Sequence, residues 1–272
     1  MKKENRNELI FKRNEKNSTS FIIWLIILIS VNAMMLASFG SVAEMAKNTE
    51  AMLSQYPEEF VKAMNLDILQ MTNILHFYAS RTFLLVTILG SVYAVMLSSC
   101  IISKEESEKT IEFLISKPIS RISIVSSKLL CTVIYVTLFN IIFSVTNLIL
   151  LNLFKTEDFS MTAFVLVSVG AWLINIIFSL LGLVISVYSS KTKTNISIGL
   201  GLVFLGYFFS LVVSLKEELN FFKYITPFSY FNTEDLVINM KIEIPYLFIT
   251  VILCIGSIAV TFFHYKRKDI SI

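Results

Sequence analysis

Long apolar runs separated by short polar segments make up most of the chain. Each run has about 20 residues or more and contains no Asp, Glu, Lys or Arg away from its ends. A helix needs about 20 such residues to cross the hydrocarbon core of a bilayer. The pattern predicts transmembrane helices at about 20–39, 81–102, 129–154, 161–190, 196–215 and 244–265.

The composition fits an all-α integral membrane protein in which residues 1–272 form a single transmembrane domain. Of the 272 residues, 55% are hydrophobic and only 16% are charged. The net charge of +3 is too small to indicate a nucleic-acid partner. The three cysteines lie in or beside apolar runs without CxxC spacing, which is typical of small packing residues.

The distribution of Lys and Arg predicts the orientation. With the N-terminus inside, the cytoplasmic segments hold sixteen of the 23 basic residues, and the outer segments hold seven. Basic residues are enriched in cytoplasmic loops. We therefore expect a multi-pass protein of the cell membrane with both termini in the cytoplasm.

The segments outside the spans differ in character. Residues 1–19 are basic with one apolar helical face, which favours an amphipathic elbow helix at the lipid surface; a disordered basic tail is the alternative. Residues 40–77 and 216–243 are expected to be extracellular loops. Within the first of them, Pro57-Glu58-Glu59 has the features of a helix start.

The polar residues predicted at depth are neutral: Asn32, Asn140, Asn147 and Asn175. Ion-coupled transporters usually need ionisable groups there, and channels a charged ring or a carbonyl filter. We expect these amides to join helices by hydrogen bonds. Small residues of the fifth span (Ser197, Gly199, Gly201 and Gly206) favour close helix approach. Any transport must then be driven from outside the lipid.

The sequence does not indicate an enzyme. There is no GxxxxGK[ST] phosphate loop, and the two histidines, His76 and His264, are predicted at opposite faces of the membrane. The pair Glu105-Glu106 resembles the EExxxR element of intramembrane CAAX-type proteases. However, no Arg follows at the required position, and no inner pair of histidines accompanies it. We predict neither catalytic residues nor a metal site.

Residues 103–121 are the longest charged interruption on the predicted cytoplasmic side. Ser103-Lys104-Glu105-Glu106 fits a capping box, which predicts a helix start at Ser103. Ile111, Leu114 and Ile115 form one apolar face, and Pro118 ends the helix. The physics predicts a short amphipathic rod, which fits either a coupling element or a helix that lies passively at the interface.

This stretch resembles the segment between the second and third spans of ABC-2 type transporter permeases, roughly E-E-x-x-x-G-T-x-E-x-L-L-S-x-P-I-S-R. The matching residues are Glu105, Glu106, Thr110, Glu112, Leu114, Ile115, Ser116, Pro118, Ile119, Ser120 and Arg121. Lys109 stands where the family usually has Gly, and Ile115 replaces the second Leu. The segment 224–231 is similar to the L-S/T-P-F-x-Y-F element before the family's last span.

The resemblance implies a permease subunit that pairs with a second permease copy or a homologous permease in the membrane. A separate ABC ATPase subunit would bind ATP and Mg, and this chain would hold no cofactor itself. The residues implied to contact the ATPase through the 103–118 coupling helix are Glu105, Glu106, Thr110, Ile111, Glu112, Phe113, Leu114, Ser116, Lys117, Pro118 and Arg121. Lys191, Thr192 and Lys193 would make a second, smaller contact.

The neutral spans favour export of an amphipathic or hydrophobic cargo, such as an antimicrobial or other peptide. A lipid-linked glycan or a heme-related compound would fit nearly as well. The rival function is a non-transporting scaffold or signalling subunit that binds a cytoplasmic partner through the same loop. Neither the cargo nor the choice between homodimer and heterodimer follows from the sequence.

Overall fold

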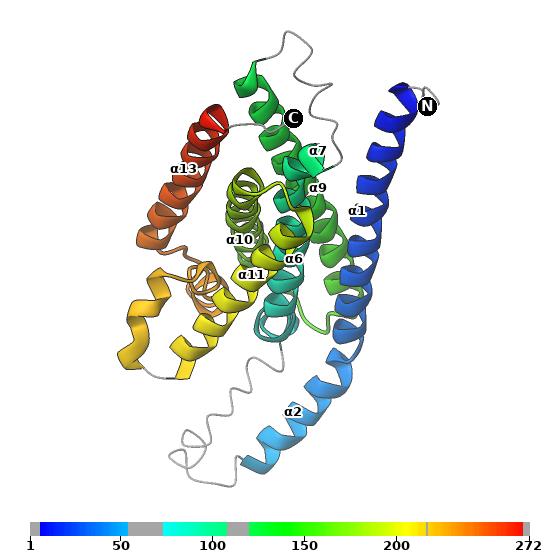
Figure 1. The fold of residues 1–272 in the computed structure, drawn as a ribbon. Helices are drawn as coiled ribbons and strands as arrows, with labels where there is room; N and C mark the ends of the chain where they lie inside the picture. Colours follow the sequence, from blue (N-terminus) through cyan, green and yellow to red (C-terminus); the bar gives the residue numbers. More distant parts are fainter. Residues whose placement is uncertain (1–5, 54–72, 108–119, 216, 269–272) are drawn as a thin grey trace.

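The computed structural model describes residues 6–53, 73–107, 120–215 and 217–268, and all regular secondary structure in these ranges is helical (Figure 1). Six helical segments are long and apolar enough to cross a membrane, as the sequence predicts. The helices are α1 Arg6–Ala37, α2 Phe39–Leu53, α5 Ile74–Phe77, α6 Phe83–Ile101, α7 Ser103–Ser107, α9 Arg121–Phe154, α10 Met161–Tyr188, α11 Thr192–Leu215, α12 Thr233–Val237 and α13 Ile244–Arg267.

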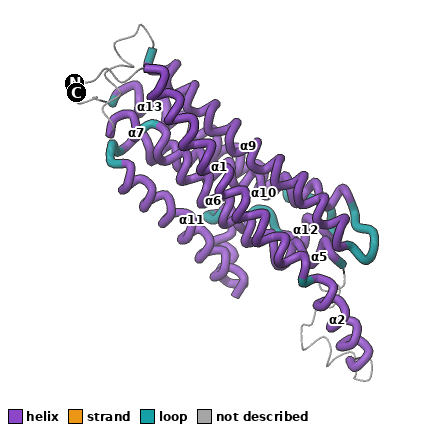
Figure 2. Tube along the Cα trace, turned by 90° about the vertical axis from the view of Figure 1, so that its right-hand side faces the viewer, coloured by secondary structure: helices purple, strands orange, loops and turns teal. Residues whose placement is uncertain are grey.

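Helices α6 and α10 form the centre of the bundle. In each of these two spans, 61% of the most apolar 18-residue stretch is buried inside the protein. The corresponding share is only 17% in α11 and in α13. The views in Figures 1 and 2 agree that α1, α9, α11 and α13 surround this pair. Helix α1 begins, and α13 ends, at the same end of the bundle as α7 (Figure 1). Helix α2 extends beyond the opposite end (Figure 2).

Local sequence signals set several helix ends. Ser120 and Ser160 are N-caps, and their hydroxyls accept the amides of Ser123 and Ala163. Such caps satisfy N–H groups that have no partner within the helix. Pro lies in the first turn of α13, where its missing N–H costs nothing.

Glycines allow the two central helices to approach closely. A Cβ on Gly182 would lie 2.1 Å from Ser98 Oγ and 3.2 Å from the Val95 carbonyl oxygen. On the fifth span, Gly199 faces Val95 and Gly206 faces Phe178, as the pattern of small residues predicts. Gly201 has nothing within 4 Å of its Cβ position, so it faces away from the rest of the described chain.

The asparagines at depth join helices, as predicted. Asn32 of α1 donates to the side-chain oxygen of Asn147 of α9. Asn147 in turn donates to the Tyr78 hydroxyl at 2.9 Å. Between α9, α10 and α6, Asn175 Nδ2 donates to Asn140 Oδ1 at 3.0 Å, and Ser91 Oγ donates to Asn175 Oδ1 at 3.2 Å. These bonds satisfy polar groups for which the lipid hydrocarbon offers no hydrogen-bond partner.

The ends of the first two spans differ from the sequence-based expectations. Residues from Arg6 onward belong to the single helix α1, so a separate elbow helix over 1–19 is not confirmed. The first span continues to Ala46 and α2 to Leu53, so the expected outer loop begins later than residue 40. The predicted helix start at Pro57 lies outside the described residues. The second span begins at Ile74 and includes the π-helical turn η1 Tyr78–Thr82.

We predict that Gly182→Ala destabilises the bundle. The added methyl group meets Ser98 and backbone atoms of α6, and overpacking of this kind costs about 1–3 kcal/mol. Thermal unfolding in detergent measures the change. Gly256→Ala is the control, because nothing lies within 4 Å of its Cβ position. Equal stability of the two variants would contradict the close packing described.

Candidate functional site

The short helix α7 follows directly on α6, and Ser103 is not its N-cap. The Ser103 hydroxyl donates instead to the Ser99 carbonyl oxygen one turn earlier, at 3.1 Å. The amides of Ile102 and Ser103 both donate to Ser186 Oγ of α10, at 3.0 Å each. Helix α7 begins at Ser103 as predicted, but the capping box that was expected to fix this start is not formed. A hydroxyl from a neighbouring helix supplies the acceptor, because this turn is buried inside the bundle.

Glu105 is directed inward and pairs with Lys128 of α9. The residue is only 3% exposed, and the Lys128 side chain is 16% exposed. A buried carboxylate is tolerated only when a cation and hydrogen bonds compensate for its lost hydration. This pair attaches α7 to the inner part of α9.

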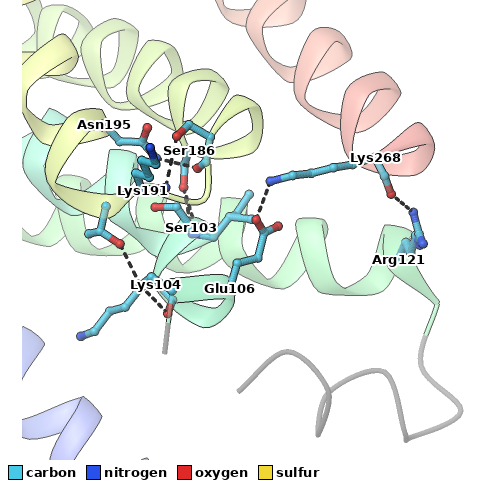
Figure 3. Close-up of polar contacts among 12 residues, drawn as sticks. Ser103, Lys104, Glu106, Arg121, Ser186, Lys191, Asn195 and Lys268 are labelled. Carbon is cyan, nitrogen blue, oxygen red and sulfur yellow. Dashed lines mark hydrogen bonds and ion pairs between the residues drawn. The ribbon is translucent and has the colours of Figure 1, made fainter. Parts of the chain in front are cut away.

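Glu106 pairs with Lys268, the residue that follows α13, at 2.7 Å. Arg121, the first residue of α9, donates from Nη1 to the carbonyl oxygens of Lys268 at 2.6 Å and Lys266 at 3.4 Å. These carbonyls are at the end of α13, where they lack partners within the helix and carry the negative end of its dipole. Figure 3 shows Lys268 between Glu106 and Arg121.

The short connection between α10 and α11 lies beside α7. Ser107 Oγ and Thr192 Oγ1 are 3.0 Å apart and share a hydrogen bond. The connection is held in shape by Asn195, whose Nδ2 donates to the Ser189 carbonyl oxygen at 2.9 Å, and by the Lys191 amide, which donates to Ser189 Oγ at 3.1 Å. The two segments predicted to contact a partner are therefore adjacent.

We call this set of contacts the α7 junction. It comprises Ser103, Glu105, Glu106 and Ser107 together with Arg121, Lys128, Ser186, Thr192 and Lys268. Through it α7 contacts α9, α10, α11 and the end of α13, and it continues α6. One short helix is thereby bonded to every described span except the first.

The junction contains some of the predicted coupling residues. Glu105, Glu106, Arg121 and Thr192 lie within it. Lys191 lies in the adjacent connection, and Lys193 lies in the first turn of α11. Thr110, Ile111, Glu112, Phe113, Leu114, Ser116, Lys117 and Pro118 lie outside the described residues, as does Lys109. Sequence reasoning missed Lys128, Ser186 and Lys268 as partners. The two lysines entered only the orientation argument.

The second family-like segment, 224–231, folds back against the opposite end of the bundle. Thr226 Oγ1 donates to the Gly206 carbonyl oxygen of α11 at 2.6 Å. Phe228 packs against Phe178 of α10, with ring centroids 5.0 Å apart. The Tyr230 hydroxyl donates to the Tyr224 carbonyl oxygen at 2.7 Å, and burial raises the pKa of Tyr230 to about 12. The segment closes over the ends of α10 and α11.

A cavity of about 520 Å³ lies beside this segment. Its wall combines Ser80 of the π-helical turn with the aromatic rings of Phe228 and Tyr246. It also contains two carboxylates, Asp235 and Glu243. Single-turn π-helices in longer helices occur often at functional sites.

Within the described ranges, no three His, Cys, Asp or Glu side chains are placed to hold a metal ion.

The fold defines a multi-pass membrane protein, built from six apolar helices joined by neutral hydrogen bonds. A model of the ABC-2 family transporter proteins matches residues 14–270, and the chain belongs to this family. Proteins of this family are membrane permeases of ABC transporters, and they normally work with an ABC ATPase subunit. None of the curated proteins searched matches the chain.

We predict that Ser186→Ala loosens the α7 junction. The substitution removes the acceptor of two buried amides, which costs about 1–3 kcal/mol. Hydrogen exchange at Ile102 and Ser103 should become faster on the order of tenfold, since each 1.4 kcal/mol changes local opening by that factor. Ser197→Ala is the matched control: its exposed hydroxyl donates only to a carbonyl of its own helix, that of Lys193. Unchanged exchange in Ser186→Ala would contradict the bonding described.

Proposed function

We propose that the chain is the permease subunit of an ABC exporter and that a separate ATPase drives it through the α7 end. The observation that carries this proposal is the α7 junction, in which one short helix is bonded to four further helical elements. A push on α7 would move these elements together. Helix α6, which α7 continues, is one of the two most buried spans, so the movement would reach the centre of the bundle.

In this proposal the 103–118 segment seats in the ATPase, and the connection at 191–193 makes the smaller contact. The hydrogen bond between Ser107 and Thr192 supports this arrangement, because it holds the two surfaces side by side. ATP and Mg would be bound by the partner chain. Closure of the ATPases on nucleotide would then be converted into movement of the spans between inward and outward states.

The orientation that this requires has the α7 end in the cytoplasm. It is supported by the excess of Lys and Arg in the segments at that end. The start of α1 and the end of α13 would then also be cytoplasmic, and the cavity beside the 224–231 segment would face outward.

A second permease copy, or a homologous permease, is the proposed membrane partner. Support comes from the outward face of α11, where Ser197, Gly201, Leu205 and Phe208 recur at helical spacing and are exposed. Small residues at such spacing let two helices approach closely in lipid.

The proposed cargo is amphipathic or hydrophobic, such as an antimicrobial or other peptide. The spans offer it aliphatic, aromatic and amide groups rather than ionised ones. The cavity at the outer end is also mixed in character, since its wall combines aromatic rings with carboxylates and hydroxyls. Such a wall suits a molecule with both apolar and polar parts.

The coupling proposal is tested by the double substitution Glu112→Arg and Phe113→Asp, which places charge on the segment expected to enter the ATPase. In nanodiscs with the cognate ATPase, we expect co-purification of the two subunits and permease-dependent ATP hydrolysis to fall at least about tenfold, because burying an unpaired charge at an interface costs several kcal/mol. The control is Lys155→Ala, which removes an exposed cation at the opposite end. If the double variant retains full assembly and hydrolysis, the coupling role is excluded. Assembly without permease-dependent hydrolysis in the unmodified protein favours the scaffold function.

The orientation is tested with single cysteines in a cysteine-free background. Lys193→Cys and Asp158→Cys form a matched pair, since both positions are exposed: Lys193 lies in the first turn of α11, and Asp158 lies in the short connection at the opposite end. In intact cells, a membrane-impermeant maleimide should label Asp158→Cys and leave Lys193→Cys unlabelled until the cells are opened. Labelling of Lys193→Cys in intact cells would reverse the proposed orientation.

A further inference from the structure

One residue at the end of the last helix contacts both ends of the connection between α7 and α9. The Lys268 ammonium pairs with Glu106 of α7, and the Lys268 carbonyl oxygen accepts a hydrogen bond from Arg121, the first residue of α9. Glu106 and Arg121 are 15 positions apart in sequence. Lys268 brings them together at the base of this connection (Figure 3).

Burial distinguishes the Lys268–Glu106 ion pair from an ion pair on the surface. The Lys268 and Glu106 side chains are 13% and 9% exposed. Exposed pairs contribute little because water and salt screen them, whereas removal of one partner from a buried pair leaves the other charge without compensation. Lys268 pairs with Glu106 Oε2, and Glu106 Oε1 has no hydrogen-bond partner among the described residues, so the carboxylate depends on Lys268.

The neighbouring basic residues make different contacts. The Arg267 guanidinium lies 4.0 Å from the centre of the Phe263 ring on its own helix. The Lys266 side chain is exposed, and the described residues offer it no ion pair or hydrogen bond. The contact to α7 is therefore a property of position 268 and not of the basic helix end in general.

In the described chain, the other side-chain contacts at the inner end of α13 are apolar and aromatic. The most apolar stretch of α13 is only 17% buried, and Tyr265 is buried in an apolar cluster with Ile101 and Val187. The His264 ring stacks on Tyr188 of α10, with ring centroids 4.0 Å apart. This apolar packing keeps α13 in place without Lys268. It gives no directional link to the α7–α9 connection, because apolar contacts allow sliding that an ion pair and a hydrogen bond resist.

We propose that Lys268 is a positioning residue: it links α7 to the first residue of α9 and makes the last span move with α7. The inference rests on the proposed function, in which α7 receives the movement of the ATPase. The pair Glu105–Lys128 and the Ser186 hydroxyl would carry that movement to α9 and α10. Lys268 would provide the direct link from α7 to α13.

The link itself is tested on the permease alone in nanodiscs, without an ATPase. We compare Lys268→Ala with Lys266→Ala by hydrogen exchange at residues 104–107 and 121–124. Exchange at 104–107 should become faster on the order of tenfold in Lys268→Ala and stay within about twofold in Lys266→Ala, because only the first loses the ammonium that pairs with Glu106. Exchange at 121–124 should stay within about twofold in both variants, because the carbonyl oxygen that accepts from Arg121 belongs to the backbone and is kept. Lys268→Arg, which keeps a cation of sufficient reach, should restore slow exchange. Equal exchange at 104–107 in the two alanine variants would overturn the proposal.

The transmission of movement is tested in the complex with the ATPase. Spin labels at Ile244→Cys on α13 and Glu157→Cys between α9 and α10 report the distance between the outer ends of these helices, with and without vanadate-trapped nucleotide. In Lys268→Ala the nucleotide-dependent change should fall by about half or more while ATPase binding is retained. Lys268→Arg and Lys266→Ala should both keep the full change.

The outcomes separate this proposal from the proposed function. Faster exchange together with a reduced distance change supports the positioning role. Faster exchange with an unchanged distance change overturns it, although the link exists. If the unmodified permease binds no ATPase, the proposed function fails and the positioning role fails with it. The exchange result then reports only a structural contact.

Discussion

The close crossing of α6 and α10 is the contact on which the other helices depend. It requires Gly182 where Ser98 and the backbone of α6 approach, and Gly90 where the Asn175 side chain occupies the space of a Cβ. In lipid there is no hydrophobic force between apolar helices, so close packing and interhelical hydrogen bonds must supply the association energy. The remaining spans pack on this pair with much larger exposed faces, which leaves them free to shift relative to it.

At the α7 end, buried ion pairs join the helices in addition to neutral hydrogen bonds. Glu105 and Glu106 are turned toward the protein, and each is matched by a lysine from a different helix. Two buried pairs on adjacent residues give the short helix two separate attachments. A helix of this length would not be stable alone, since isolated helices shorter than about 12 residues are marginal in water. Its structure thus depends on the same helices that it is proposed to move.

The sequence was sufficient for the architecture and insufficient for the contacts. Six spans could be predicted because length and hydropathy alone decide which segments cross a bilayer. The bonding of Asn147 and Asn175 could be expected because amides at depth need partners, but their partners depend on helix rotation, which no single-span pattern fixes. Ser103 was misjudged for a related reason: a capping box assumes that the turn faces water, whereas Ser186 of α10 covers it. Lys268 lies 162 positions from Glu106, so only the folded arrangement brings them together.

The amide links between the spans have a consequence for how the protein responds to the membrane potential. Moving one elementary charge through the potential is worth about 2.3 kcal/mol per 100 mV. Within the six described spans the groups that join helices at depth are neutral, among them Asn32, Asn140, Asn147 and Asn175. Rearrangement of these helices therefore displaces little charge through the electric field. The balance between conformations should then be nearly independent of voltage, and it would be the same in an energised and a depolarised cell.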